Sequence, residues 1–369
     1  MPKAQETVLE IDLKVLTHNY KHLKSKLKEN TKVLAVVKAF AYGSDACEIA
    51  KHLQEQEIDY FAVAYVDEGI ALRKAGILKP ILVLHPISVN FGALIEYNLE
   101  PSLYSTKILE DFIAIASKRQ LSNYPVHIKF NTGLNRLGFK ENDINFITER
   151  LGATEVIKVV SLFSHLAASE DLNERSFAQN QIEQFKACSE RMIELLGYKP
   201  ILHICNTSGI LNYPEAHFDM VRTGIGLYGY GNSEKESKYL KPIATLKTII
   251  SQIHEIQAGE SVGYNQAFTA KSIMRTATLP LGHADGISRI YGKGKGFVTI
   301  KGKKAPIVGN VCMDMIMVNV TNIDCKEGDE AIVFGPETTS AETLAESAKT
   351  ISYELITSIS QRVKRNILK

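Results

Sequence analysis

Hydrophobic and polar residues alternate along the first two thirds of the chain with two different periods. Continuous apolar runs, such as residues 33–37 and 159–163, have the pattern of strands buried on both faces. Between such runs lie segments with apolar residues three and four positions apart, such as residues 13–29 and 107–119, which is the helical period. After a first strand-like run at residues 8–12, eight strand–helix units follow in about 200 residues. This pattern predicts a TIM barrel; an open doubly wound sheet is the alternative, because the number of strands does not prove closure.

The pattern changes after a polar, charged segment at residues 233–238. Beyond it, most apolar stretches are strand-like and separated by turn signals, and only residues 341–348 and 351–363 have a helical pattern. We therefore predict an α/β protein with two domains: an N-terminal barrel at residues 1–235 and a mostly-β C-terminal domain at residues 236–369.

Composition and charge exclude several classes of partner. The chain has 43 basic and 41 acidic residues and a net charge of +2, so no global field attracts nucleic acid or an anionic membrane. No run of roughly 18 apolar residues could span a bilayer, and the first ten residues contain no signal-peptide pattern. The five cysteines are scattered without a C-x-x-C pair, which favours free thiols in the cytoplasm and predicts neither disulfides nor a metal site.

The carboxyl ends of the predicted barrel strands carry many titratable side chains, and Lys38 is the most informative of them. It directly follows the apolar run at residues 33–37, so its amine is expected at the barrel mouth against an apolar floor. Desolvation there would lower its pKa and make it a candidate nucleophile. The alternative is a surface lysine that merely ends a strand. The full set of strand-end residues is Lys38, Tyr65, His85, Tyr104, Lys129, His165, Asn206 and Arg222.

Nine segments, in order, resemble the signature motifs of bacterial alanine racemases. The first, residues 35–43, is similar to the family's pyridoxal-phosphate lysine motif, and the second, residues 129–138, to its next signature. The others lie at residues 163–167, 203–208, 221–229, 261–264, 282–286, 309–314 and 352–354. The resemblance covers the chain from about residue 8 onwards. It implies a barrel, a C-terminal β domain, and a homodimer in which each active site borrows residues from the partner's C-terminal domain.

The resemblance also implies a cofactor, a reaction and four catalytic residues. Lys38 would bind pyridoxal phosphate as a Schiff base and act as the base on one face of the alanine Cα. Tyr264, contributed by the other subunit, would act on the opposite face, so that L- and D-alanine interconvert. His165 would link Tyr264 to Arg222, and Arg222 would face the pyridine nitrogen and leave it unprotonated, because arginine keeps its own proton.

Further residues are implied as binding groups. Arg136 would contact the substrate carboxylate and the cofactor's phenolic oxygen, oriented by Lys129, which is often carbamylated in the family. Met313 and His283 would lie at the substrate end of the site. The remaining cofactor contacts, mostly to the phosphate, would come from Tyr42, Asn206, Thr207, Ser208, Gly224, Ile225 and Tyr353.

Two departures from the family pattern concern the substrate and the cofactor pocket. Phe40 stands in the lysine motif where the family has asparagine or aspartate, and His283 replaces a tyrosine. The resemblance implies that D-alanine is made for peptidoglycan. Two alternatives remain: a broader amino-acid racemase or a related decarboxylase, and a non-catalytic protein that binds pyridoxal phosphate for its homeostasis.

Overall fold

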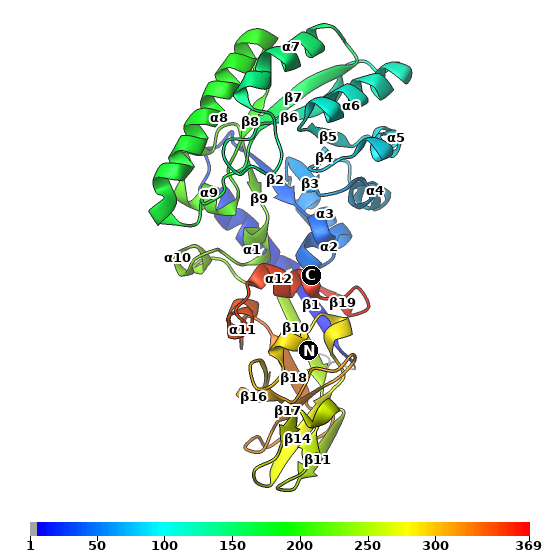
Figure 1. Cartoon of the computed structure of the whole chain (residues 1–369), viewed down its shortest axis with the longest axis vertical. Helices are drawn as coiled ribbons and strands as arrows, with labels where there is room; N and C mark the ends of the chain where they lie inside the picture. Colours follow the sequence, from blue (N-terminus) through cyan, green and yellow to red (C-terminus); the bar gives the residue numbers. More distant parts are fainter. Residues whose placement is uncertain (1–5) are drawn as a thin grey trace.

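The computed structural model describes residues 6–369 of the chain (Figure 1). Residues 1–5, which belong to the N-terminal segment without a signal-peptide pattern, lie outside the described part. No helix within residues 6–369 is long and apolar enough to cross a membrane. All five cysteines are free thiols.

Eight parallel strands form the first sheet, in the order β8-β7-β6-β5-β4-β3-β2-β9. Its two edge strands approach each other, because Asp219 N donates to Leu202 O (3.1 Å) and Arg222 N donates to Cys205 O (3.0 Å). The sheet therefore curves into a nearly closed barrel, which confirms the predicted TIM barrel over the open sheet. The strands are β2 Lys32–Val36, β3 Tyr60–Val63, β4 Ile81–Val83, β5 Glu100–Leu103, β6 Tyr124–Lys129, β7 Ile157–Phe163, β8 Ile201–His203 and β9 Met220–Thr223.

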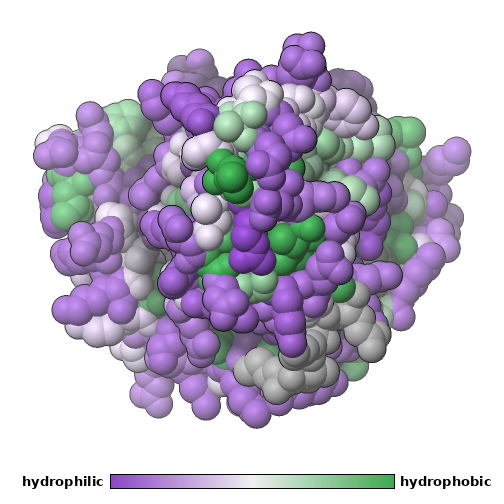
Figure 2. All heavy atoms as spheres, turned by 90° about the horizontal axis from the view of Figure 1, so that it is seen from below, coloured by the Kyte–Doolittle hydropathy of each residue, from purple (hydrophilic) through white to green (hydrophobic). Residues whose placement is uncertain are grey.

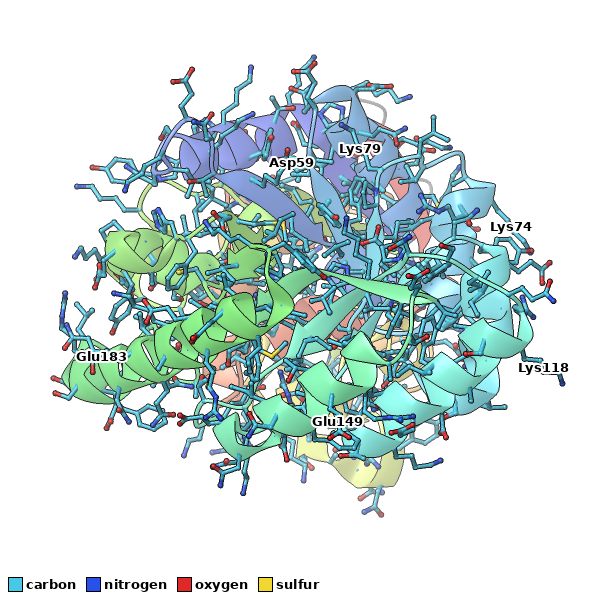
Figure 3. The ribbon with its side chains drawn as sticks, turned by 90° about the horizontal axis from the view of Figure 1, so that it is seen from above. Asp59, Lys74, Lys79, Lys118, Glu149 and Glu183 are labelled. Carbon is cyan, nitrogen blue, oxygen red and sulfur yellow. The ribbon has the colours of Figure 1, made fainter. Side chains whose placement is uncertain are left out.

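Helices surround this barrel, and their polar faces point outward. Figure 3, seen from above, shows Lys118 of α6, Glu149 of α7 and Glu183 of α8 directed away from the strands. The opposite face of α6 buries five apolar side chains against the barrel, as its helical period requires. The helices are α1 Leu13–Lys24, α3 Ala46–Glu55, α4 Val66–Lys74, α5 Phe91–Glu96, α6 Thr106–Lys118, α7 Ile144–Gly152, α8 Arg175–Leu196 and α9 Thr207–Asn212.

A nine-stranded sheet forms the second part, in the order β11-β14-β17-β16-β15-β18-β10-β1-β19. Its strands are β1 Val8–Asp12, β10 Ala244–Ile249, β11 Gln252–Ile256, β14 Met274–Leu279, β15 Phe297–Ile300, β16 Lys303–Val308, β17 Ile316–Asn319, β18 Glu330–Phe334 and β19 Lys364–Leu368. A small hairpin and three short helices complete it: β12 Ser261–Val262, β13 Phe268–Thr269, α10 Glu234–Ser237, α11 Ala341–Ser347 and α12 Ser352–Ser358. The predicted helix at residues 351–363 was too long, because Ile359 is extended and β19 follows.

The two ends of the described chain meet in this second sheet. Strand β1 pairs antiparallel with β10 and parallel with β19, so the first strand contributes to the sheet of the C-terminal part (Figure 1). Apolar side chains of both parts belong to one continuous core cluster. The β sheet is consequently packed directly against the loops at the mouth of the barrel.

Candidate active site

A cavity of about 510 Å³ lies at the carboxyl ends of the barrel strands. Loops at this end of a TIM barrel normally carry the functional side chains. Eleven of the fifteen residues predicted from the sequence line it: Lys38, Tyr42, Lys129, Arg136, His165, Asn206, Thr207, Arg222, Gly224, Ile225 and Tyr353. Tyr353 comes from α12, so the C-terminal part already contributes to the cavity of its own chain.

The chain makes a left-handed turn immediately after Lys38. In α2, Lys38–Gly43, the four residues from Ala39 to Tyr42 have φ between +51° and +54°, a conformation that costs roughly 1–2 kcal/mol for each non-glycine residue. The Glu68 carboxylate accepts the N–H of Ala39 (2.6 Å) and also those of Ala64 and Tyr65, which immediately precede α4. Tertiary contacts therefore stabilise a backbone conformation that the periodicity of the sequence does not reveal.

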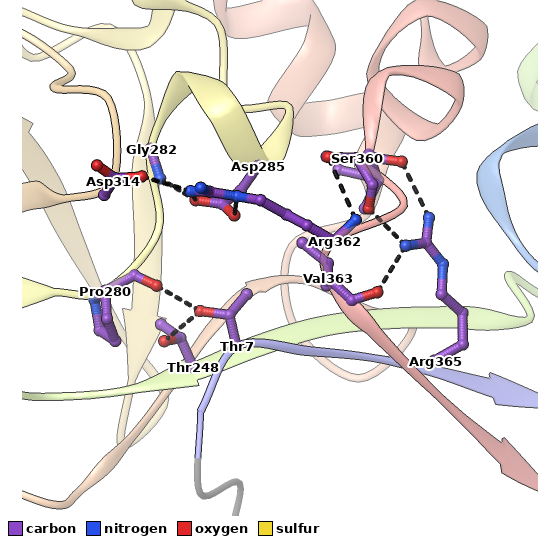
Figure 4. Close-up of polar contacts among 11 residues, drawn as sticks. Thr7, Thr248, Pro280, Gly282, Asp285, Asp314, Ser360, Arg362, Val363 and Arg365 are labelled. Carbon is purple, nitrogen blue, oxygen red and sulfur yellow. Dashed lines mark hydrogen bonds and ion pairs between the residues drawn. The ribbon is translucent and has the colours of Figure 1, made fainter.

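The far end of this turn is held against the C-terminal part. Arg365 donates to the carbonyl oxygens of Gly43 (2.8 Å), Ser44 (3.2 Å) and Ile359 (2.9 Å). It also donates to those of Ser360 and Val363, as Figure 4 shows. Gly43 has φ +81°, and a Cβ there would lie 1.9 Å from the backbone oxygen of Ile356. Only glycine permits this approach.

Electrostatics shift the Lys38 amine towards its neutral form. Burial lowers its pKa, the positive charge of Arg136 lowers it further, and the carboxylate of Glu68 partly opposes them. A neutral lysine amine is the form that acts as nucleophile and base. The expectation of a desolvated lysine at the barrel mouth is thereby supported by its surroundings.

Three more cationic side chains line the same cavity: Lys129, Arg136 and Arg222. None of the ion pairs formed within residues 6–369 involves them. Burial, followed by repulsion from Arg222, Arg136 and Lys38, lowers the pKa of Lys129 to about 8. The cavity therefore favours anionic groups.

Arg222 and His165 form a hydrogen-bonded pair at the wall of the cavity. Arg222 Nη2 donates to His165 Nδ1 (3.1 Å) and to the carbonyl oxygen of Ser164 (2.6 Å). Because a guanidinium only donates, His165 Nδ1 carries no proton and a neutral ring has its proton on Nε2. Burial, and then the charge of Arg222, hold the pKa of His165 well below its usual range. Burial lowers the pKa of Arg222 to about 10, which leaves it charged at neutral pH.

Small and hydroxyl-bearing residues line the other end of the cavity. Thr207 Oγ1 lies 3.4 Å and 3.3 Å from the N–H groups of Gly224 and Gly226, which precede and follow Ile225. A Cβ on Gly224 would lie 2.3 Å from the Tyr42 hydroxyl. The Tyr42 and Tyr353 rings are 6.1 Å apart. This end offers hydroxyl donors and backbone amides without bulk, as a phosphate group requires.

Ser208 is not brought to the cavity. Its Oγ donates to Glu236 Oε2 (2.9 Å) and accepts from Asn232 Nδ2 (2.8 Å), so it faces α10 and the loop that precedes α10. Of the two neighbouring hydroxyls considered for the phosphate, only that of Thr207 lines the cavity. Asn206 lines it too, and its side chain caps α9 by accepting from Gly209 N (2.8 Å).

Three predicted residues lie in the C-terminal part, away from this cavity. Tyr264 and Met313 line a second hollow of about 710 Å³, which shares no lining residue with the first. Their exposed fractions are 74 % and 59 %. His283 is exposed beside them, and its N–H donates to the carbonyl oxygen of Cys312 (2.9 Å). Figure 2, which views this end, shows hydrophobic residues gathered in a hollow of a mostly hydrophilic surface.

An ion-pair network fixes the loop that carries Met313. Arg362 contacts both carboxylate oxygens of Asp285 (2.7 and 3.0 Å) and also Asp314 (2.6 Å), as Figure 4 shows. Asp285 in turn accepts the N–H of Gly282 (2.8 Å). The loops that present His283 and Met313 are thus tied together by one arginine.

Sequence reasoning missed Glu68 and Arg362. Glu68 lies three residues after Tyr65, which is the spacing of a helix cap, and this spacing was the only signal for it. Arg362 gave no signal, because its two carboxylate partners are 77 and 48 residues distant in the chain.

Comparison with known proteins covers nearly the whole chain. The alanine racemase N-terminal domain model matches residues 11–232, and the alanine racemase C-terminal domain model matches residues 243–367. An alanine racemase of Thermodesulfovibrio yellowstonii is 36 % identical over 97 % of each chain, and one of Clostridium perfringens is 37 % identical over 96 % of this chain and 94 % of its own. The solved structure of alanine racemase from Clostridium difficile 630 superposes with a TM-score of 0.93 at 34 % identity, covering 100 % of this chain and 97 % of the other.

Proposed function

The chain belongs to the alanine racemase family and is an isomerase of that kind, and we propose that it interconverts L- and D-alanine at the barrel mouth with pyridoxal phosphate as its cofactor. The observation that carries the proposal is the cavity's electrostatics. A half-buried amine with a lowered pKa shares the cavity with three cationic side chains that have no carboxylate partner within residues 6–369. Such a cavity suits a phosphorylated aldehyde and an amino-acid carboxylate.

The residues present fit pyridoxal phosphate. Gly224 leaves room beside the Tyr42 hydroxyl, and Thr207, Tyr353 and the backbone amides near Ile225 supply neutral donors for the phosphate. Arg222 Nε has no hydrogen-bond partner within residues 6–369, so it is available to a neutral ring nitrogen. When bound, the cofactor supplies the electron sink that lets a proton leave Cα.

Each cavity residue then has a defined task. Lys38 would hold the cofactor aldehyde, and once the substrate amine has taken its place there, the released Lys38 amine would accept or return the Cα proton on one face. Arg136, with its planar donor fork, holds the substrate carboxylate. Arg222, which is charged at neutral pH, would donate to the ring nitrogen of the bound cofactor, and neutral His165 would keep its Nε2 proton available for transfer. Lys129 contributes positive charge or, if carbamylated, a carboxylate that orients Arg136.

The opposite face of Cα needs a second acid–base group, and we propose that the partner's Tyr264 supplies it. In a single chain Tyr264 is largely exposed and lies in the separate hollow with Met313. A homodimer in which this hollow covers the neighbouring barrel mouth would bring Lys38 and the partner's Tyr264 to opposite faces of one substrate. Met313 and His283 would then shape the substrate end.

This arrangement makes both parts of the chain necessary. We propose that residues 1–235, apart from β1, which the second sheet takes up, form the cofactor-binding domain and that residues 236–369 form the domain that completes the partner's site. We further propose that the enzyme acts in the cytoplasm and that its D-alanine serves peptidoglycan synthesis, as the family resemblance implies.

The function is tested by exchange of the alanine Cα hydrogen in D₂O, with chiral separation of the two enantiomers. Wild-type protein loaded with pyridoxal phosphate should exchange the hydrogen and form D-alanine from L-alanine. Absence of exchange would refute the racemase assignment. A panel of other L-amino acids, assayed in parallel, separates an alanine racemase from a broader racemase, and carbon dioxide release identifies a decarboxylase.

The shared site is tested by complementation between Lys38→Ala and Tyr264→Phe chains. Each variant alone should be nearly inactive, and Tyr264→Phe should retain the visible absorbance of the bound cofactor. After random subunit exchange half of the dimers are mixed, each with one intact site of two, so about a quarter of wild-type activity should return. No recovery, with exchange verified by mass, would exclude a site shared between subunits.

A further inference from the structure

A continuous series of hydrogen-bonded, buried side chains runs through the interior of the barrel from Arg222 to Glu100. We call these five residues, Arg222, His203, Ser161, His127 and Glu100, the relay. Arg222 Nη1 lies 2.7 Å from His203 Nδ1, and His203 Nε2 lies 3.0 Å from Ser161 Oγ. Ser161 Oγ lies 2.5 Å from His127 Nδ1, and His127 Nε2 lies 2.7 Å from Glu100 Oε2. All five residues are buried, and each belongs to a different barrel strand from β5 to β9.

The relay connects the two ends of the barrel. Glu100 is the first residue of β5, at the amino end, whereas His203 is the last residue of β8, next to the cavity. Ser161 reaches the interior through an irregularity: Val126 pairs with Val159 but His127 pairs with Ser161, so β7 has one extra residue at this point. Such a bulge re-aims the side chain that follows it.

The hydrogen-bond directions follow from the two ends of this series, because the Arg222 guanidinium only donates and the Glu100 carboxylate only accepts. Because a guanidinium has no acceptor, His203 Nδ1 must be unprotonated, and His203 Nε2 then donates to Ser161 Oγ. The Ser161 hydroxyl donates to His127 Nδ1, and His127 Nε2 donates to Glu100. Burial and the charge of Arg222 hold the pKa of His203 well below its usual range, consistent with a neutral ring.

A doubly protonated His127 would break this order. Both histidines would then donate to Ser161 Oγ, and the Ser161 proton would have no acceptor among the contacts of residues 6–369. A buried polar network is stabilising only when every member is satisfied. The neutral arrangement satisfies all of them, with every donor directed from Arg222 towards Glu100.

We propose that Glu100, His127 and Ser161 are positioning residues that lock His203 in its Nε2–H form and so hold Arg222 in place at the cavity. Without Ser161 as acceptor, the Nδ1–H form of His203 would direct a donor at the guanidinium and displace it. The proposal rests on the proposed function only where it concerns the cofactor, because the tautomers are a property of the chain alone.

The test uses full-length protein with ¹⁵N-labelled histidine side chains and two matched alanine variants. Ser161→Ala interrupts the relay. Ser102→Ala is the control, since Ser102 is a fully buried barrel residue that pairs with His127 on the neighbouring strand, and its Oγ has no hydrogen-bond partner among residues 6–369. Long-range ¹H–¹⁵N spectra of the cofactor-free protein report the tautomer of each ring, with signals assigned by His127→Asn and His203→Asn.

In wild type and Ser102→Ala we expect neutral His127 and His203, both in the Nε2–H form. In Ser161→Ala the ¹⁵N signals of His203 should show the Nδ1–H form instead. Titration of this variant with pyridoxal phosphate should show about tenfold weaker binding. Its kcat should fall by about tenfold while KM for alanine stays within about twofold. Glu100→Leu should perturb His127 likewise, whereas Glu100→Gln keeps a carbonyl acceptor and should preserve the wild-type spectrum.

An Nδ1–H His203 or a charged His127 in wild type would overturn the proposal, as would equal spectra and cofactor affinity for Ser161→Ala and Ser102→Ala. If wild-type protein shows the expected tautomers but does not racemise alanine, the proposed function fails while the relay stands. If Ser161→Ala does not fold, the comparison of Glu100→Leu with Glu100→Gln decides the question by the same spectra.

Discussion

Replacing Lys129 by a neutral residue should stabilise the cofactor-free protein at neutral pH. Lys129 is 6 % exposed, and burial together with Arg222, Arg136 and Lys38 lowers its pKa from 10.5 to about 8. At 1.36 kcal/mol per pH unit, its protonated form destabilises the folded state by about 3 kcal/mol. Lys129→Met removes the charge and keeps most of the side-chain length.

The pH dependence gives this prediction its sign. The folded-state pKa lies below that of the unfolded chain, so the penalty is complete below about pH 8 and fades as the pH rises towards 10.5. Urea unfolding in CO₂-free buffer should show Lys129→Met to be more stable than wild type by up to about 3 kcal/mol at pH 7 and by little at pH 10. Lys118→Met, at an exposed position on α6, is the control and should show no such trend.

The same lowered pKa makes Lys129 reactive towards CO₂. At pH 7.4 about a fifth of Lys129 is neutral, against about one in a thousand for an ordinary lysine. Its amine can therefore form a carbamate, which replaces repulsion from Arg136 and Arg222 by attraction. Bicarbonate should stabilise wild type but not Lys129→Met, with a carbamate signal in ¹³C spectra. A stability difference between the two proteins that is equal at pH 7 and pH 10 would show that packing, not charge, is responsible.

Two further substitutions test the frame around the site. Gly43→Ala should destabilise the fold by more than about 3 kcal/mol in thermal denaturation, because its Cβ would clash with a carbonyl of α12. Gly76→Ala also has a positive φ but open space, so it should cost only about 1 kcal/mol; equal losses would discount the clash. Arg362→Ala frees the loop held through Asp285 and Asp314 and should raise KM for alanine about tenfold, with a melting temperature near that of wild type. An unchanged KM would show that this loop takes no part in substrate binding.

The barrel itself and the residues at the carboxyl ends of its strands could be predicted from the sequence alone. Apolar runs of five or so residues must be buried on both faces, and helices with a 3.6-residue period must cover them, so the alternation predicts a barrel. Within a barrel the residue after each strand faces the mouth. Lys38, Lys129, His165 and Arg222 could therefore be assigned to one cavity without any contact being known.

Contacts between distant segments decided what the sequence left open. The left-handed turn after Lys38 exists because Glu68 and Arg365 satisfy its backbone groups, and β1 joins the second sheet because β10 and β19 offer it two free edges. The relay from Glu100 to Arg222 needs a bulge in β7 that no period marks. Sequence patterns report which face of an element is buried, whereas the partner that satisfies each buried polar group is chosen only when remote segments pack together.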